Sequence, residues 1–300
     1  MAIAVPPRIK AVASRAHRSE FVATLLLRAA CALVVLSIAA LIAYLASEGT
    51  KLFTHDHVSP FEFLFSPVFN PEANHPGSLV FIVGSLAITA FAVFVGGPFG
   101  IAVGVLLSEL APRRFVDVMK PAVEVLVGIP SVIYGWIGLT LLVPLIRTVT
   151  GSNGFGLLAA GIVLSVMILP TIITLSEDAL RAVPDSLREG SAAMGATRWQ
   201  TISRVLLPAA SSGLTVAVIL GVARAIGETM AVQLVIGNAA VLPTGLLSAT
   251  AALPTEIVQD MSGAQQGSLL EHALFSMALL LLLIAMGLIL AVRLAVRRRA

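Results

Sequence analysis

Residues 186–208, SLREGSAAMGATRWQTISRVLLP, form a polar segment between two long hydrophobic runs. Cationic side chains within or beside this segment are Arg181, Arg188, Arg198 and Arg204. A polar, glycine-containing segment of this length cannot lie in hydrocarbon, because every backbone N–H and C=O group there needs a partner within the protein. The segment therefore lies in water or against another protein, while the hydrophobic runs beside it are suited to a membrane.

Composition places the whole chain in the membrane class. Of its 300 residues, 58% are hydrophobic and 12% are charged, and the mean hydropathy is +0.99. Soluble domains carry about 25% charged residues, so a soluble fold is excluded. The formal net charge of +3 does not indicate nucleic-acid binding, because the charges lie in clusters between hydrophobic runs, as membrane topology requires.

The hydrophobic runs predict an all-α polytopic membrane protein with six transmembrane helices. Each run is long enough to cross about 30 Å of hydrocarbon. We expect spans at residues 24–47, 78–108, 121–146, 157–175, 211–237 and 272–292. The expected organisation is an N-terminal cytoplasmic tail (1–23), a retained first span (24–47), a core of five further spans (78–292) containing a cytoplasmic loop (176–210), and a basic tail (293–300).

The distribution of cations fixes the orientation. If the N-terminus is cytoplasmic, the outside segments hold only Lys51 and Arg147, and Arg28 and Arg224 lie within spans. The other fifteen of the nineteen cations are then cytoplasmic: Arg8, Lys10, Arg15, Arg18, Arg113, Arg114, Lys120, Arg181, Arg188, Arg198, Arg204, Arg293, Arg297, Arg298 and Arg299. The positive-inside rule therefore predicts a multi-pass membrane protein with cytoplasmic termini and a cytoplasmic loop at 186–208.

Two ionisable residues lie inside the expected fifth span. Arg224 is about 13 residues from its cytoplasmic start, or roughly 20 Å along a helix, and we expect Glu228 one turn later on the same face. Charges at this depth cost about 2.5–3.5 kcal/mol each on insertion scales, so they face a pathway or each other. Two interpretations remain: an Arg–Glu bridge that locks helices together, or an anion path in which Arg224 meets the anion and Glu228 orients it and moderates its charge. The planar guanidinium suits phosphate or sulfate.

The remaining sequence features give weaker indications of a functional site. The run His55-Asp56-His57, with His75, resembles a set of metal ligands, but histidines in a short surface loop have no fixed geometry and we expect no metal site. No arrangement of catalytic residues lies inside the spans, so we expect no catalytic site. Glycines 96, 100 and 104 recur every four residues and predict close packing of another helix, whereas Pro98 should kink or break its helix.

The loop has the residue spacing of a known motif. Glu189 is followed by the small pair Gly190-Ser191, then by Gly195, an aliphatic residue at Val205, and Leu207-Pro208. This pattern resembles the cytoplasmic coupling loop, or EAA loop, of ABC importer permeases, with Gly-Ser where that family commonly has Ala-Ala. The resemblance implies docking onto an ATP-hydrolysing subunit through Glu189, Gly190, Ser191, Gly195, Leu207 and Pro208.

Three further runs narrow the resemblance. They are RAIGETMAV at 224–232, GIPSVIYG at 128–135 and SELAP at 108–112. Together they resemble the PstC-type permease subunit of phosphate ABC importers, over about residues 61–293. The resemblance implies the type I importer permease fold, with a substrate pathway lined by Arg224, Glu228, Thr229, Ser131 and Tyr134. The last two lie nearer the cytoplasm, and whether they line the pathway or only pack stays open.

The resemblance also implies partners: a second, PstA-type permease, two ATP-binding subunits and an extracytoplasmic phosphate-binding protein. This chain has no Walker A motif and no Gly-Lys pair, so ATP and Mg²⁺ are expected on the partner ATPase and no cofactor is expected here. We expect a transporter subunit, not an enzyme. Two alternatives stay open: a permease for another oxyanion such as sulfate or molybdate, and a non-conducting sensory membrane subunit.

Overall fold

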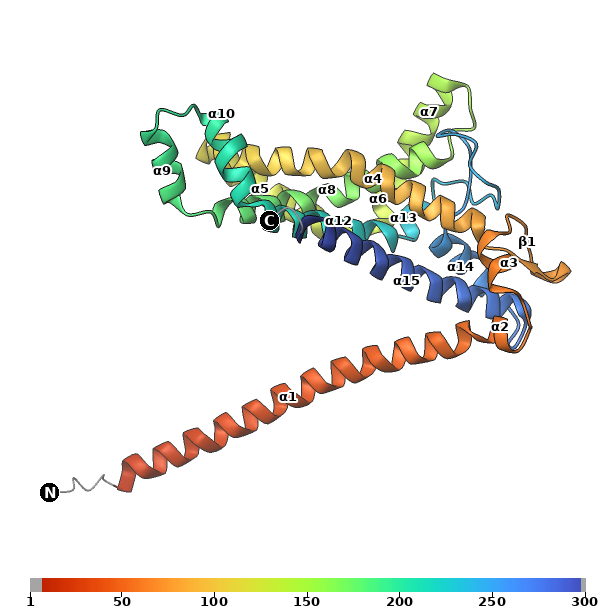
Figure 1. The fold of residues 1–300 in the computed structure, drawn as a ribbon, viewed down its shortest axis with the longest axis horizontal. Coiled ribbons are helices and arrows are strands. Elements are labelled where there is room, and N and C mark those ends of the chain that lie inside the picture. The colour runs from red at the N-terminus through yellow and green to blue at the C-terminus, as the bar shows by residue number, and fades with distance from the viewer. Residues whose placement is uncertain (1–6, 298–300) are drawn as a thin grey trace. The chain divides into compact units, whose positions relative to one another are not determined.

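The computed structural model describes the backbone of residues 7–297, and the side chains of residue 20 and of residues 23–294. Contacts divide the chain into two units, residues 1–48 and residues 49–300. The first unit is one long helix, α1 (Pro7–Gly49), drawn in red in Figure 1. Residues 1–6 and 298–300, which belong to the expected tails 1–23 and 293–300, lie outside the described residues.

The second unit is helical apart from one small ribbon. Its extracytoplasmic start contains α2 (Lys51–Thr54), α3 (Pro60–Phe65), β1 (Phe69–Asn70), the 3₁₀ turn η1 (Pro71–Ala73) and β2 (His75–Pro76). There follow α4 (Leu79–Val105), the π-helical turn η2 (Leu106–Leu110), α5 (Arg113–Gly128), α6 (Ser131–Ile137), the π-helical η3 (Gly138–Leu142), α7 (Val143–Thr150) and α8 (Leu157–Arg181). The rest comprises α9 (Asp185–Ala193), α10 (Arg198–Thr201), the π-helical η4 (Ile202–Leu206), α11 (Leu207–Ala209), α12 (Ser211–Ile226), α13 (Met230–Gln233), α14 (Leu253–Met261) and α15 (Leu269–Arg297).

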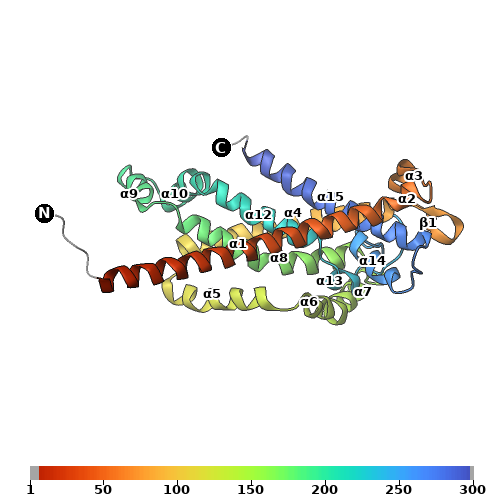
Figure 2. The ribbon, with the colours of Figure 1, turned by 90° about the horizontal axis from the view of Figure 1, so that it is seen from below.

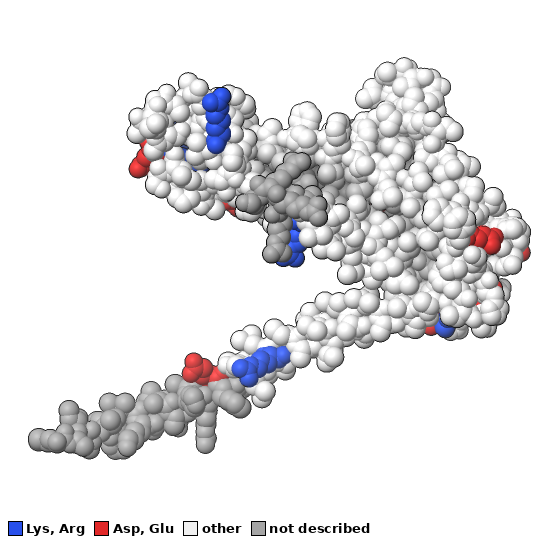
Figure 3. Space-filling view, viewed as in Figure 1, with Lys and Arg blue, Asp and Glu red and all other residues white. Residues whose placement is uncertain are grey.

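The predicted all-α polytopic fold is confirmed. Helical stretches long and apolar enough to cross a membrane are Ala23–Thr54, Leu79–Leu110, Ser131–Thr150, Leu157–Arg181 and Leu269–Leu294. A further pair of helices, Arg198–Ala209 and Ser211–Ile226, passes the same test only when the two are taken together, and they meet at a bend of 71°. On the face shown in Figure 3, Lys, Arg, Asp and Glu of the second unit gather at its two ends and leave the surface between them uncharged.

The third span begins later than expected. The sequence predicts one helix over residues 121–146, but α5 ends at Gly128 and α6 begins at Ser131. The break falls at Ile129 and Pro130, both of which have extended backbone conformations. A residue before proline is disfavoured in the helical region, and this explains the break. The membrane-spanning stretch therefore starts at Ser131, and α5 is a separate amphipathic helix with no buried residue.

The fifth span is also interrupted. The sequence predicts a continuous helix over residues 211–237, but α12 stops at Ile226, Gly227 caps it, and α13 starts again at Met230. The 16 residues of α12 extend about 24 Å, which is short of the hydrocarbon thickness of about 30 Å. The irregular backbone between α12 and α13 therefore lies at membrane depth.

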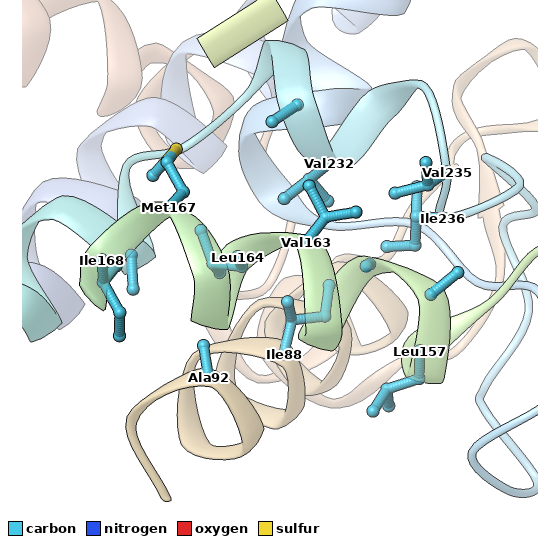
Figure 4. Packing of buried hydrophobic residues seen from close by; sticks show 14 of the residues in the cluster. Ile88, Ala92, Leu157, Val163, Leu164, Met167, Ile168, Val232, Val235 and Ile236 are labelled. Carbon is cyan, nitrogen blue, oxygen red and sulfur yellow. The ribbon is translucent and has the colours of Figure 1, made fainter. Parts of the chain in front are cut away.

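Helix α8 occupies the centre of the bundle. In its apolar stretch 67% of residues are buried, compared with 11% in α15. Figure 4 shows side chains of α8 between Ile88 and Ala92 of α4 on one side and Val232, Val235 and Ile236 on the other. This arrangement makes α8 the helix against which the other core segments are positioned.

The glycine pattern on α4 has the predicted role. Gly96, Gly100 and Gly104 face α8, and an added Cβ at Gly100 would lie 2.6 Å from Cγ2 of Ile172. At Gly104 it would lie 2.7 Å from Cβ of Ser176. The close packing predicted from these glycines is confirmed. The expected break at the proline between them is absent, since α4 continues to its end at Val105.

Each end of the second unit has its own hydrophobic core. The extracytoplasmic core contains Leu52, Val58, Phe63, Val80, Phe81, Ala251, Leu253, Ala273, Leu274 and Met277. The cytoplasmic core contains Val105, Leu180, Val183, Ile202, Leu206, Ala210 and Leu214. Figures 1 and 2 both show α9 and α10 at one end of this unit and α2, α3 and β1 at the other. The cores therefore anchor the loops on opposite sides of the membrane.

The connector between α13 and α14 folds back onto α8. Leu246 and Val235 accept hydrogen bonds from the backbone N–H groups of Leu158 (2.7 Å) and Gly156 (3.1 Å). These bonds serve donors at the start of α8 that have no partner within that helix. Helix α14 follows this connector and begins at Leu253.

Candidate functional site: a mid-membrane helix break and a cytoplasmic coupling surface

Arg224 lies near the middle of the bundle. It is the third residue from the end of α12, is half-buried, and donates from Nη1 to Oγ1 of Thr171 on α8 at 3.0 Å. Thr171 is ten residues before Arg181, the last residue of α8, which corresponds to about 15 Å along the helix. The guanidinium is therefore held at mid-membrane depth by a neutral hydroxyl.

The structure corrects the expected relation between Arg224 and Glu228. Because α12 ends at Ile226, Glu228 does not lie one turn later on the same helix face. Its Oε1 instead accepts a hydrogen bond from the backbone N–H of Ala231 at 3.1 Å, within α13. No ion pair within 4.0 Å joins Arg224 and Glu228 in the described part of the chain. The bridge that would lock helices together is therefore not formed between these two residues.

Helix α6 packs against the break between α12 and α13. An added Cβ at Gly135 would lie 2.7 Å from Cα of Ala231, so the two backbones are in close contact. Tyr134, one residue earlier, donates its hydroxyl to the carbonyl of Leu126 at 2.8 Å and so spans the break between α5 and α6. Tyr134 therefore belongs to the segment of α6 that packs against α13, the helix that follows the break after Arg224.

The two remaining expected pathway residues belong to the same segments. Ser131, the first residue of α6, is half-buried and lies one turn before Gly135. Thr229, between α12 and α13, is half-buried and donates to the carbonyl of Gly227 at 3.3 Å. Irregular backbone at membrane depth is tolerated only where it is buried in protein or lines a water-filled cavity. Interrupted helices of this kind form the substrate sites of many transporters.

The polar loop forms a compact helical hairpin at the cytoplasmic end. Glu189 and Gly190 are exposed on α9, and the Ser191 hydroxyl is 2.8 Å from that of Thr201 on α10. Thr197 caps α10 by accepting from the backbone of Gln200 at 3.3 Å, and the Gln200 side chain accepts from the backbone of Thr197 at 2.8 Å. The hairpin therefore has a fixed shape and presents α9 to the solvent.

Gly195 makes the turn between these two helices. An added Cβ at this position would meet nothing within 4 Å in the described chain. The constraint is the backbone, since Gly195 has a φ of +75°, a conformation that favours glycine. Leu207 is half-buried and Pro208 exposed in the short helix α11.

Arg188, which the sequence did not single out, fastens this hairpin to the membrane core. Its Nη2 donates to Oε1 of Glu109 at 2.7 Å and to the carbonyl of Leu180 at 2.9 Å, and its Nε donates to Oε2 of Glu109 at 3.4 Å. Its Nη1 donates to the carbonyl of Val183 at 2.7 Å and to Asp185 at 3.2 Å. The hydrogen bond with Glu109 is the main cause that raises the pKa of Arg188 above its ordinary value. All five N–H donors of the side chain are thus used.

A second ion-pair cluster joins α5 to α8. The carboxylate of Glu177, 1% exposed, lies 3.3 Å from Nζ of Lys120 and 2.8 Å from Nε of Arg181. Asp178 lies 3.7 Å from the same lysine. The sequence places these residues near span ends, but it gives no signal for pairings over 57 and 79 residues, the separations of Lys120 from Glu177 and of Glu109 from Arg188.

The histidines at the extracytoplasmic end are arranged differently from the set considered in the sequence. His75 pairs with Glu62 at 3.2 Å. His55 and Asp56 instead meet His272 at the start of α15, a residue 216 positions away from Asp56. The reason for expecting no metal site, the lack of fixed geometry, therefore fails for His55 and Asp56.

Comparisons with known proteins define the class. The family model described as binding-protein-dependent transport system inner membrane component matches residues 96–299. The chain belongs to this family: it is a permease subunit of an ABC transporter and a multi-pass protein of the inner membrane. Members of this class work with ATPase and substrate-binding partners.

Individual relatives are consistent with the resemblance found in the sequence. The chain is 47% identical to the probable ABC transporter permease protein YqgH of Bacillus subtilis, over 90% of this chain and 89% of the relative. It is 34% identical to the phosphate transport system permease protein PstC of Haemophilus influenzae, over 79% and 81%. The predicted resemblance to PstC-type permeases is confirmed.

A solved structure supports the fold. The chain superposes on an inward-facing conformation of the MetNI methionine ABC transporter with a TM-score of 0.59 and 26% identity, covering 72% of this chain and 93% of that one. The predicted type I importer permease fold is confirmed.

Proposed function

We propose that this permease conducts inorganic phosphate as one half of the translocation pathway of an ATP-driven importer. The observation that carries the proposal is Arg224, which is held at mid-membrane depth by the neutral Thr171 and lies just before the break between α12 and α13, where α6 packs against α13. Charged residues inside membrane spans mark substrate pathways unless they are paired. The relatives named phosphate transport system permease protein PstC, at 34% and 35% identity, support phosphate as the anion.

The chemistry of the path follows from its residues. The guanidinium of Arg224 offers two parallel N–H donors to a tetrahedral oxyanion, and Thr171 keeps one edge of the guanidinium oriented toward α8. The carboxyl group of Glu228 orients the anion and moderates its charge in this proposal. Thr229, Ser131 and Tyr134 offer neutral hydroxyl groups for further contacts. The anion is thus bound by one charge and several dipoles, and it can leave again.

The helical hairpin formed by α9 and α10, here called the coupling hairpin, docks the ATPase in this proposal. The full assembly contains a second, PstA-type permease, two ATP-binding subunits that bind ATP and Mg²⁺, and an extracytoplasmic phosphate-binding protein. The contact is made by Glu189, Gly190, Ser191 and Gly195, with Leu207-Pro208 closing the loop. Arg188 of α9 bonds to Glu109 in η2, which directly follows α4, and to Leu180 near the end of α8. A movement of the hairpin is therefore transmitted to both α4 and α8.

A substitution at the exposed face of α9 tests docking. Glu189→Lys reverses one charge on an exposed side chain that forms no ion pair within the described residues. We expect ATP hydrolysis without uptake, or loss of the ATPase from the complex. Phosphate uptake equal to wild type, with the ATPase bound, would remove the docking assignment.

Radiolabelled uptake into sealed vesicles that hold the complete assembly tests the substrate. We expect ATP-dependent accumulation of phosphate that an excess of sulfate or molybdate does not reduce. Accumulation of sulfate or molybdate in place of phosphate would assign the path to that oxyanion. An assembled, ATP-hydrolysing complex without uptake of any of the three anions would favour the non-conducting sensory subunit.

A further inference from the structure

The structure assembles three metal-ligating side chains at its extracytoplasmic end. His55 and Asp56 lie directly after α2, and His272 lies in the first turn of α15. Nδ1 of His272 is 2.6 Å from Oδ2 of Asp56, and Nδ1 of His55 is 2.9 Å from Oδ1 of the same carboxylate. One ligand atom from each residue lies within 4.8 Å of the other two.

Burial distinguishes this cluster from incidental surface histidines. The side chains of His272 and Asp56 are 5% and 15% exposed, whereas that of His55 is 74% exposed. Burial raises the pKa of Asp56, but the hydrogen bonds from His55 and His272 outweigh it and hold this pKa below its ordinary value. Two fixed ligands and one accessible ligand give an ion a route from the solvent into the cluster.

The backbone around the cluster is held in place independently of the ligands. Ser276, one turn after His272, donates to the carbonyl of Gly49 at 2.5 Å and to that of His272 at 2.9 Å. The backbone N–H of Asp56 donates to the carbonyl of Lys51 at 3.2 Å. These contacts fix the segment after α2 against the first turns of α15, so binding of an ion requires little ordering of the chain.

We propose that His55, Asp56 and His272 bind a divalent transition-metal ion of the Zn²⁺ type. Two imidazoles and one carboxylate form a common set of three zinc ligands, with water in the fourth position. Tetrahedral bonds of about 2.0–2.2 Å separate neighbouring ligand atoms by roughly 3.4 Å. The present N···O distances of 2.6 and 2.9 Å need to widen by less than about 1 Å. The ring centroids, 5.7 Å apart at an interplanar angle of 77°, leave room for this.

The chemistry balances without a further reactant. On binding, each imidazole presents the Nδ1 lone pair to the metal, and any proton on Nδ1 moves to Nε2 or is released to solvent. The bound ion replaces the two hydrogen bonds to Asp56 with three coordinate bonds. Such an ion fastens the segment after α2 to the first turn of α15 from outside the membrane.

The test measures metal binding by the assembled transporter in lipid nanodiscs, with Co²⁺ as a spectroscopic probe and Zn²⁺ in competition. We expect one Co²⁺ bound per chain, with the visible absorption of a tetrahedral site, displaced by Zn²⁺. Asp56→Asn and His272→Gln should each weaken binding at least about tenfold, since even changes behind the ligands cost 10- to 100-fold. His55→Gln, at the exposed ligand, should weaken binding without affecting assembly.

His75→Gln is the matched control. It removes another histidine that pairs with a carboxylate, Glu62, at the same end of the protein, and it should leave Co²⁺ binding unchanged. No stoichiometric Co²⁺ binding, or equal binding by wild type and His55→Gln, would overturn the proposal and leave the cluster as a set of hydrogen bonds. If Asp56→Asn fails to assemble, the comparison of His55→Gln with His75→Gln decides the outcome.

Discussion

Arg188 and Arg224 are the same side chain in two very different surroundings. Arg188, at the cytoplasmic coupling hairpin, makes five hydrogen bonds, to Glu109, Leu180, Val183 and Asp185. Arg224, at mid-membrane depth, makes one hydrogen bond to a neutral hydroxyl within the described residues. The first guanidinium is saturated by the protein, and the second has donors left for a ligand.

The difference separates a mechanical role from a binding role. A guanidinium that is fully paired holds helices together and has little capacity for an anion. A guanidinium in a low-dielectric region without a carboxylate partner keeps a strong attraction for an anion. In the proposed function, Arg188 fastens the coupling hairpin and Arg224 is left to bind the anion.

The largest effect on stability is expected from Arg188→Gln. It leaves the mostly buried carboxylate of Glu109, 12% exposed, without its cation, which should lower the free energy of unfolding by about 3 kcal/mol. Denaturant titration of the purified protein measures this loss. Arg204→Gln, an exposed arginine in the same loop, should change stability by less than about 0.5 kcal/mol. A loss at Arg188 no larger than at Arg204 would contradict its fastening role.

A smaller effect is expected at the partner of Arg224. Thr171→Val removes the hydroxyl that orients the guanidinium while keeping the side-chain shape. A hydrogen bond to a charged group contributes about 1.5–3 kcal/mol, so we expect phosphate uptake at low phosphate to fall about tenfold or more. Thr174→Val is the control, because the Thr174 hydroxyl bonds only within its own helix, to Pro170 at 2.9 Å. Equal uptake by the two variants would argue against an oriented Arg224.

Two glycines of the coupling hairpin give a sharper test of its geometry. Gly195→Ala places a side chain at a φ of +75° with open space around it, so only backbone strain of about 1 kcal/mol is expected. Gly190→Ala lies inside α9, also with nothing within 4 Å, and should stabilise by up to about 1 kcal/mol. Thermal unfolding compares them. Effects of the same sign would show that the turn is not fixed as described.

Glu256 contrasts with Glu109, because Glu256 is a buried carboxyl group that has no cationic partner within the described residues. It is 4% exposed on α14, and burial together with the neighbouring Asp260 raises its pKa from 4.5 to about 7. The folded protein therefore holds this proton more tightly than the unfolded chain, so stability is full below pH 4.5 and falls as the pH rises to about 7. Glu256→Gln should remove this contribution to the pH dependence of unfolding. An unchanged pH profile would contradict the assignment.

Local features of the fold could be predicted from the sequence. The glycines of α4 recur at helix spacing, so their contact with α8 follows from pattern alone. The orientation of the spans was predicted from the excess of Lys and Arg on one side of the membrane. This prediction is possible from sequence because the excess is a property of whole loops and not of individual contacts. The break at Ile129-Pro130 has a signal in the sequence, because the helical conformation is disfavoured for a residue before proline. The expected span nevertheless included these residues, because it was placed by hydrophobicity alone, which does not show where helices end.

Long-range pairings could not be predicted in the same way. Glu109 and Arg188 are 79 positions apart, and Asp56 and His272 are 216 apart. Each was visible only as a polar residue near a span end, and the partner depends on how helices pack. The placement of Glu228 one turn after Arg224 on the same helix face was predicted from helix spacing and is wrong, because the helix ends between them.

The most direct test of the account compares Arg224→Gln with wild type in sealed vesicles that hold the complete assembly. Radiolabelled phosphate uptake and ATP hydrolysis are measured on the same preparation. The account predicts an assembled, ATP-hydrolysing complex whose uptake falls at least about tenfold, the loss of a charge-assisted hydrogen bond of about 1.5–3 kcal/mol. Uptake equal to wild type would contradict the account and make Arg224 a structural residue.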